Sequence, residues 1–280
     1  MHIFTTITSL QKYITDQKKN GATIGFVPTM GALHAGHISL IAQALQECTV
    51  VICSVFVNPT QFNNAADLQK YPRTLEADTA LLAKNGCTAV FAPSAEEMYP
   101  NGNKTMLAFD LGTLDTVMEG ESRPGHFAGV ITVVDKLFNA VQPNIAYFGQ
   151  KDFQQLAVIN AMTKVLHPTI KIVGCATMRE VDGLAMSSRN TRLDEHWRRE
   201  SVQIFKILTH AKTLATKGIE PNVIVQIAIE NFSHTLLQLD YFELVNGNTL
   251  LPATNYTQPC VLCVAAYAGD VRLIDNMRVE

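Results

Sequence analysis

His34 and His37 stand three residues apart, just after a short turn that follows an apolar run at Thr23–Val27. That run is typical of a buried strand, and the residues after His37 repeat apolar side chains at helical spacing. Side chains three apart lie side by side on a helix, so both imidazoles are expected to project from its first turn. Free backbone N–H groups and the helix dipole make such a turn a phosphate site, where imidazoles can stabilise phosphoryl oxygens. Gly36 would let a flat base approach the backbone closely.

An HxxH pair can also simply cap or pack a helix, and for an isolated pair that interpretation is the better one. Here the pair follows a predicted strand and the turn Pro28-Thr-Met-Gly31. Ligands of α/β folds bind beyond the carboxyl ends of the strands, so this position favours phosphate chemistry.

Polar residues follow two other predicted strands. Asn58 and Gln61 come after the apolar run Val50–Val57, and their amides can bind hydroxyls and carboxylates without adding charge. Lys151 can place a charge over phosphate oxygens, and Asp152 can cap the following helix, anchor Lys151 or reach Mg²⁺ through water. The alternatives are an ordinary Asn-Pro turn and a surface salt bridge.

Two loops carry groups that can bind an anion. Arg123 and His126 lie in a Gly- and Pro-rich segment typical of a mobile active-site loop. Ser187, Ser188 and Arg189 offer two hydroxyls and a guanidinium that could bind a polyphosphate. A solvated loop and a plain linker are the alternative interpretations.

Composition limits the function classes. The chain has 280 residues, of which 47% are hydrophobic, and this composition predicts a compact protein. Its formal charge of −3 indicates that it has no broad cationic surface for nucleic acid. We expect a cytoplasmic location, because the N-terminus lacks a signal-peptide pattern and no apolar stretch approaches the roughly 20 residues that span a bilayer. The pair Cys260 and Cys263 lacks a second Cys/His pair, which favours packing over a zinc site.

The elements that must position these residues alternate in the first part of the chain. Strands are expected at Thr23–Val27, Val50–Val57, Ala89–Phe91, Ile145–Phe148 and Ile170–Cys175. Helices are expected at His37–Glu47, Thr74–Asn85, Val130–Val141 and Phe153–Leu166. This alternation predicts an α/β fold, a Rossmann-like parallel sheet with helices on both faces, as a first domain over residues 1–176.

The pattern changes after about residue 176. Helices are expected at Asp194–Lys217 and Pro221–Phe232, followed by strands at Tyr241–Val245, Cys260–Ala266 and Val271–Ile274. Helices followed by strands without alternation predict a smaller α+β domain over residues 177–280.

The segment Pro28-Thr-Met-Gly-Ala-Leu-His-Ala-Gly-His37 closely resembles the first motif of the pantothenate synthetase (pantoate–β-alanine ligase) family of HxGH nucleotidyltransferases. Further segments resemble that family in the right order across nearly the whole chain: an Asn-Pro-x-Gln-Phe segment, an Arg-Pro-Gly-His-Phe loop, Gly149-Gln-Lys-Asp-Phe-Gln-Gln155 and Met186-Ser-Ser-Arg-Asn190. The last is the counterpart of the KMSKS-type loop. The sequence departs from the family at Thr60, usually aliphatic, at Gln150, usually Glu, and at Ala77, where an acid often precedes Asp78.

The resemblance implies roles for individual residues. Four are implied to be catalytic: His34, His37, Lys151 and Arg189. The resemblance implies that ATP is bound by Met30, Gly31, Ala32, Leu33, His34, Ala35, Gly36, His37, Gly149, Gln150, Lys151, Asp152, Met178, Met186, Ser187, Ser188 and Arg189. Pantoate binding falls to Gln61 and Gln155, and β-alanine binding to Gln61. Asp78 is a weakly implied Mg²⁺ ligand, since acidic residues in a first helical turn often only complement the dipole.

The implied reaction has two steps, with ATP, pantoate and β-alanine as substrates and Mg²⁺ as cofactor. Pantoate attacks the ATP α-phosphate to give pantoyl adenylate, and the β-alanine amine then displaces AMP. A homodimer is also implied. Two other functions stay open: transfer of a nucleotidyl group to a phosphorylated small molecule, and nucleotide binding by a regulatory module without catalysis.

Overall fold

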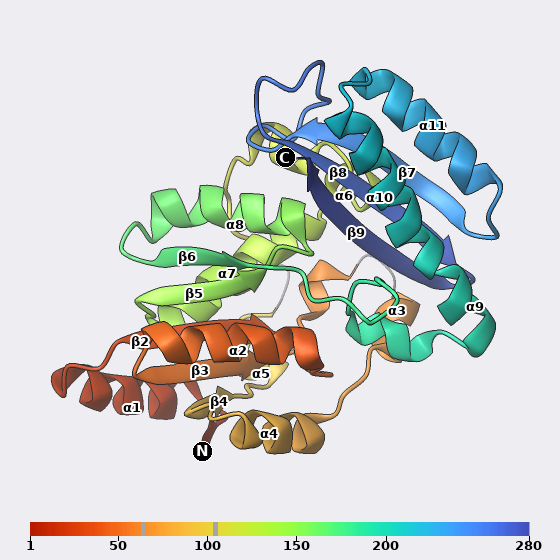
Figure 1. The fold of residues 1–280 in the computed structure, drawn as a ribbon. Coiled ribbons are helices and arrows are strands. Elements are labelled where there is room, and N and C mark those ends of the chain that lie inside the picture. Colours follow the sequence, from red (N-terminus) through yellow and green to blue (C-terminus); the bar gives the residue numbers. More distant parts are fainter. Residues whose placement is uncertain (63–64, 103–105, 280) are drawn as a thin grey trace. The chain divides into compact units, whose positions relative to one another are not determined.

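The structure is a computed structural model that describes residues 1–62, 65–102 and 106–279, and the chain in it divides into two compact units (Figure 1). The first unit comprises Met1–Leu111, Arg123–Gln150 and Gln155–Ala176. The second unit comprises Gly112–Ser122, Lys151–Gln154 and Thr177–Glu280. Two short segments that precede residue 176 in the sequence therefore group with the C-terminal residues.

The first unit is built on a parallel sheet of six strands, in the order β1-β4-β3-β2-β5-β6. Its strands are β1 (His2–Phe4), β2 (Ile24–Thr29), β3 (Val50–Val55), β4 (Ala89–Phe91), β5 (Ile145–Gly149) and β6 (Lys171–Cys175). The parallel sheet confirms the fold class expected from the sequence. The three-residue strand β1 was not predicted, since it is too short to show a period.

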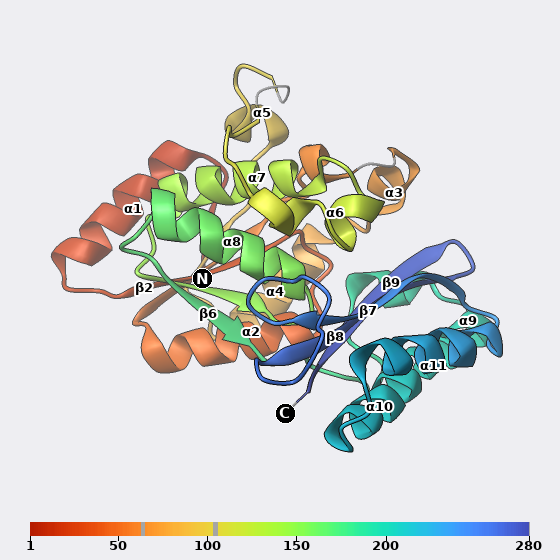
Figure 2. The same ribbon diagram turned by 90° about the horizontal axis from the view of Figure 1, so that it is seen from above.

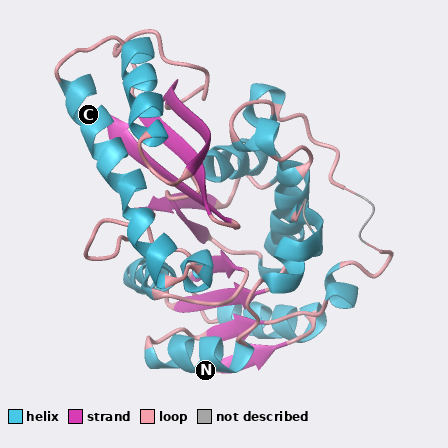
Figure 3. Ribbon diagram, turned by 90° about the vertical axis from the view of Figure 1, so that its right-hand side faces the viewer, coloured by secondary structure: helices cyan, strands magenta, loops and turns pink. Residues whose placement is uncertain are grey.

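Helices cover both faces of this sheet (Figure 3). The helices of the first unit are α1 (Ile7–Lys19), α2 (Ala35–Glu47), α3 (Ala65–Lys70), α4 (Leu75–Lys84), α5 (Ala95–Met98), α7 (His126–Val141) and α8 (Phe153–Leu166). The first two residues of α8 belong to the second unit. Helices α2 and α4 pack with Val27 on one face. Phe26, on the opposite face, meets Phe138 of α7 with ring centroids 6.4 Å apart, and α1 lies beside α7 (Figure 2).

The second unit is an antiparallel sheet of three strands, β7 (Gln238–Asn246), β8 (Cys260–Ala268) and β9 (Val271–Val279), with β8 in the centre. Helices α10 (Val202–Thr216) and α11 (Pro221–Ser233) pack on it around a core that includes Leu208, Ile224 and Leu262. Its remaining elements are α6 (Glu119–Ser122), α9 (Glu195–Glu200) and the 3₁₀ turns at Gly112–Asp115 and Ser188–Arg192. The α+β class expected for the C-terminal part is confirmed.

Two further expectations concern metals and membranes. Cys260 and Cys263 are buried free thiols, as the packing interpretation requires. Among the described residues, no helix combines the length and apolar character needed to cross a bilayer.

Candidate active site

The turn after β2 is tied to a buried carboxylate. Asp78, 3% exposed on α4, accepts hydrogen bonds from the backbone N–H groups of Ala32 (3.0 Å) and Leu33 (2.8 Å). Gly31 has a φ of +82°, and a Cβ there would lie 3.0 Å from both the Asp78 carboxylate and the Val55 side chain, so only glycine fits without a shift. Ala32 has a φ of +51°, a conformation that costs a non-glycine residue roughly 1–2 kcal/mol. The carboxylate thus holds a strained turn beside the histidines.

His34 and His37 form a capping box at the start of α2. The Gly36 N–H donates to His34 Nδ1 at 3.1 Å, and the His34 N–H donates to His37 Nδ1 at 3.3 Å. The two rings lie 4.1 Å apart between centroids, so they project together as expected. Because each Nδ1 accepts a hydrogen bond, a neutral ring carries its proton on Nε2. Capping through Nδ1 is therefore compatible with hydrogen-bond donation from Nε2.

Gln61 is oriented by a chain of buried amides. Its Oε1 accepts from Asn58 Nδ2 at 3.1 Å, and its Nε2 lies 3.0 Å from the sulfur of Met30. Asn58 is 1% exposed, and its Oδ1 accepts from the Tyr99 hydroxyl (2.7 Å) and the Thr60 hydroxyl (3.1 Å). The threonine that departs from the family pattern therefore adds a donor that an aliphatic side chain lacks.

The loop at Arg123 and His126 supports the same residue. His126, which is 7% exposed, donates from Nδ1 to the Gln61 carbonyl at 2.8 Å, and Arg123 donates to that carbonyl at 3.3 Å. Arg123 also lies 3.2 Å from His126 Nε2, which can accept when Nδ1 donates. These two residues, expected from the sequence to face an anionic ligand, hold the backbone of Gln61.

The segment after β5 passes from one unit to the other. The Gln150 side chain donates to the Gly174 carbonyl at 3.2 Å, a bond that the family's usual carboxylate could not make. Lys151 Nζ lies 3.9 Å from the Asp152 carboxylate, and these two residues belong to the second unit. Gln155 is the third residue of α8 and belongs to the first unit.

The Ser-Ser-Arg segment is held by a tight turn. Arg179 pairs with Ala185 in an antiparallel bridge, and the Met186 N–H donates to the Met178 carbonyl at 3.0 Å. Ser187 caps the 3₁₀ turn that follows by accepting from the Arg189 N–H at 3.3 Å. Met178 and the residues from Met186 to Arg189 therefore lie at the base of one small hairpin.

The structure brings the predicted residues together in two groups. The first unit holds Met30–His37, Gln61, Gly149, Gln150 and Gln155, with Asp78 under the turn. The second unit holds Lys151, Asp152, Met178 and Met186–Arg189. Sequence reasoning named Asn58 as a possible ligand-binding amide and not as the support of Gln61. It missed Tyr99, because this residue is 41 positions from Asn58 in the chain.

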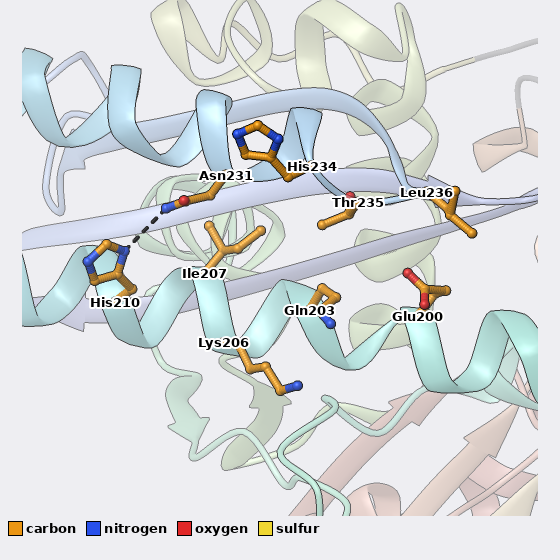
Figure 4. A pocket seen from close by; sticks show the side chains of 9 residues that line it. All are labelled: Glu200, Gln203, Lys206, Ile207, His210, Asn231, His234, Thr235 and Leu236. Carbon is orange, nitrogen blue, oxygen red and sulfur yellow. Dashed lines mark hydrogen bonds between the residues drawn. The ribbon is translucent and has the colours of Figure 1, made fainter.

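The second unit also has a hollow of about 460 Å³ elsewhere on its surface. Residues of α10 and the end of α11 line it, and Asn231 lies 3.2 Å from His210 Nδ1 across it (Figure 4). None of the site residues predicted from the sequence lines this hollow.

Comparison with known proteins decides the family. The profile described as pantoate-beta-alanine ligase matches residues 2–278. The chain belongs to this ligase family. Pantothenate synthetase of Porphyromonas gingivalis W83 is 50% identical over 283 residues and that of Bacteroides fragilis ATCC 25285 is 48% identical over 282 residues; both alignments cover all of this chain and 99–100% of the relative.

Solved structures agree with this membership. Pantothenate synthetase from Thermus thermophilus superposes with a TM-score of 0.94 at 40% identity, covering 100% of this chain and 99% of that one. The ligase from Francisella tularensis, solved with beta-gamma ATP and beta-alanine, has a TM-score of 0.84 at 37% identity, covering 99% and 97%. The resemblance read from the sequence motifs is confirmed.

Proposed function

We propose that this protein joins pantoate to β-alanine with ATP, forming pantothenate, AMP and pyrophosphate through an enzyme-bound pantoyl adenylate. Membership of the pantoate–β-alanine ligase family supports the reaction. The single geometric observation that carries it is the capping box of α2, in which both imidazoles use Nδ1 for the backbone. Each neutral ring then carries its proton on Nε2, and in this proposal that N–H donates to phosphate oxygens.

Adenylation converts a poor acylating agent into a good one. The pantoate carboxylate attacks the α-phosphorus, and pyrophosphate departs. The β-alanine amine then attacks the acyl carbon, and AMP departs. No side chain becomes bonded to substrate, so the protein acts by positioning its substrates and by stabilising developing charge.

The residues divide this work by chemistry. The Nε2–H groups of His34 and His37 stabilise oxygens of the α-phosphate as charge develops on them. Lys151 and Arg189 neutralise the departing pyrophosphate, and the hydroxyls of Ser187 and Ser188 donate to it. The remaining ATP contacts come from Met30–Gly36, Gly149, Gln150, Asp152, Met178 and Met186.

Gln61 and Gln155 fix pantoate, and Gln61 also contacts β-alanine. An amide side chain suits this task because it donates to a carboxylate and accepts from a hydroxyl. Gln61 is 9% exposed and is held through both its side chain and its carbonyl, which supports a fixed role in orienting the substrate.

Mg²⁺ accompanies ATP in this proposal. The described residues contain no cluster of three or more His, Cys, Asp or Glu side chains that could cage a metal by themselves. Mg²⁺ in nucleotide sites is held mainly by phosphates and one or two carboxylates, and Asp152, with a side chain 46% exposed, could supply one. Asp78 fits this role less well, because it is buried and both its oxygens accept backbone N–H groups. When bound, the ion neutralises charge on the phosphate oxygens. The homodimer and the cytoplasmic location expected from the sequence stay predictions.

Product analysis by mass spectrometry tests the proposed reaction. The protein is incubated with ATP, Mg²⁺ and pantoate, with and without β-alanine, and with a close amine analogue as a control. We expect AMP and pantothenate to appear only with β-alanine. A stable nucleotidyl product would favour transfer to a small molecule instead, and no turnover would favour a regulatory nucleotide-binding module.

A further inference from the structure

Strand β9 carries two adjacent polar residues that are both buried. Asp275 is 4% exposed and Asn276 is 8% exposed. Neighbouring side chains on a strand point to opposite faces of the sheet, so the two reach different partners. A buried carboxylate or amide is costly unless its hydrogen bonds are satisfied, so the partners explain why the strand keeps these residues.

Asn276 holds the backbone of Lys151. Its Nδ2 donates to the Lys151 carbonyl at 2.8 Å. On the same face of the strand, two residues further on, Arg278 lies over the ring of Phe153 with its guanidinium carbon 6.0 Å from the centroid. The strand therefore contacts the segment Lys151–Gln154 twice, and the contact from Asn276 is made to the lysine that is proposed to bind phosphate.

Asp275 holds the hairpin that ends in the Ser-Ser-Arg segment. Both its oxygens accept from the Arg179 guanidinium, in one case at 3.0 Å. Arg179 also donates to the Gly183 carbonyl at 3.0 Å and the Asn276 carbonyl at 3.2 Å, and it stacks 4.8 Å above the Phe205 ring. The guanidinium thus joins the first strand of the hairpin, which carries Arg179, and the turn at Gly183 to β9.

We propose that Asp275 and Asn276 are positioning residues that set Lys151 and the Met186–Arg189 segment at a fixed spacing for one polyphosphate. Asn276 acts through the Lys151 backbone, and Asp275 acts through Arg179. This inference rests on the proposed function. It explains why two phosphate-binding segments 35 residues apart in the chain meet the same short stretch of strand.

The first test is the substitution Asn276→Asp, which keeps the shape of the side chain but removes the donor. We expect single-turnover formation of pantoyl adenylate to slow by about 10–100-fold, because small misplacements of a reacting or charge-stabilising group have effects of this order. The KM for pantoate should change by less than about twofold, since Gln61 and Gln155 lie outside the second unit. The matched control is Ile274→Val, two residues before Asn276 on the same face of β9, which should leave the rate within about twofold of wild type.

A double-mutant cycle separates positioning from general stability. In a Lys151→Met background, adding Asn276→Asp should slow adenylation by less than about threefold, because the group that Asn276 positions is already absent. An equal loss in both backgrounds, or a wild-type rate in Asn276→Asp alone, would overturn the role of Asn276.

The role of Asp275 is tested by replacing the whole ion pair, with the double variant Arg179→Met and Asp275→Leu. Exchanging a buried pair for apolar residues often leaves stability unchanged or raises it, so a slow but stable enzyme would report lost positioning. Arg179→Lys, which keeps the charge but loses the two-pronged geometry, serves if the double variant does not fold. Wild-type adenylation in the stable variant overturns the inference for Asp275. Absence of pantothenate synthesis by the wild-type protein would instead overturn the proposed function, and this inference with it.

Discussion

The site histidines show how one side chain can serve both fold and chemistry. In His34 and His37 the Nδ1 atom closes the first turn of α2, and the Nε2 atom is left to carry the proton of the neutral ring. From the sequence, capping and phosphate chemistry were alternative interpretations of the two histidines, because their spacing does not show which ring nitrogen makes which contact. The structure shows the capping contacts at Nδ1, and the proposed phosphate contacts use the other ring nitrogen.

Substitutions of His37 can separate the roles of its two ring nitrogens. Asparagine can keep an acceptor near the position of Nδ1, and glutamine can keep a donor near the position of Nε2. We expect His37→Asn to slow adenylation by about 10²–10³-fold, the effect of losing one preorganised donor, with stability near wild type. His37→Gln should lose less rate and more stability. Single-turnover kinetics measures the adenylation rate, and urea unfolding measures the stability. A wild-type rate in His37→Asn would show that His37 does not stabilise the transition state.

The buried cysteines should not react with alkylating reagents while the protein is folded. Burial raises the pKa of Cys87 and of Cys175 to about 11. The thiolate is the reactive form, so at pH 8 only about one thiol in a thousand would be ionised at these positions. The folded protein is treated with iodoacetamide, and its peptides are analysed by mass spectrometry. We expect neither cysteine to be alkylated before the protein is unfolded. Rapid labelling of the native protein would contradict this burial.

At the scale of elements, the regular parts of the fold were predictable from the sequence. The buried strand Val50–Val55 is a nearly continuous apolar run, and the helix Ala35–Glu47 repeats apolar residues at helical spacing. The placement of Gly112–Ser122 was not predictable, because it depends on a pairing across more than 150 residues: Arg272 contacts both oxygens of Glu119 at 2.8 Å. Motifs located the candidate site residues, but not the partners that hold them.

The turn before α2 depends on Asp78. Its carboxylate accepts two backbone N–H bonds, and an asparagine would have to turn an amide N–H toward one of them. We expect Asp78→Asn to lower the free energy of unfolding by about 1–3 kcal/mol, as measured by urea denaturation without ligands. Glu76→Gln, on the exposed side of the same helix, is the matched control and should have little effect. Unchanged stability in Asp78→Asn would show that the turn does not need this anchor.

The ion pair of Arg272 and Glu119 should matter far more than a surface pair. Both side chains are mostly buried, and Arg272→Met would leave the Glu119 charge without its main partner. We expect a loss of about 3–5 kcal/mol in the free energy of unfolding. Arg199→Met breaks an exposed pair with Glu195 and should cost less than about 1 kcal/mol. Similar losses in the two variants would contradict this assignment.

At the scale of the whole molecule, the proposed reaction draws on both units. The imidazoles and Gln61 belong to the first unit, and Lys151 and the Ser-Ser-Arg segment belong to the second. Two of the points where the chain passes from one unit to the other, before Lys151 and after Gln154, fall within the motif Gly149–Gln155. A boundary near residue 176, inferred from the change in pattern alone, does not reveal these crossings, since the sequence pattern records local periodicity and not long-range contacts.

The central claim is that the pantoate carboxylate is activated on the α-phosphate of ATP. Pantoate labelled with ¹⁸O in its carboxylate tests this most directly, because an acyl adenylate leaves one of those oxygens on AMP when β-alanine attacks the acyl carbon. We expect one ¹⁸O atom in each AMP formed with pantothenate and none in pyrophosphate. Label in a released phosphate or pyrophosphate, or unlabelled AMP, would contradict the account.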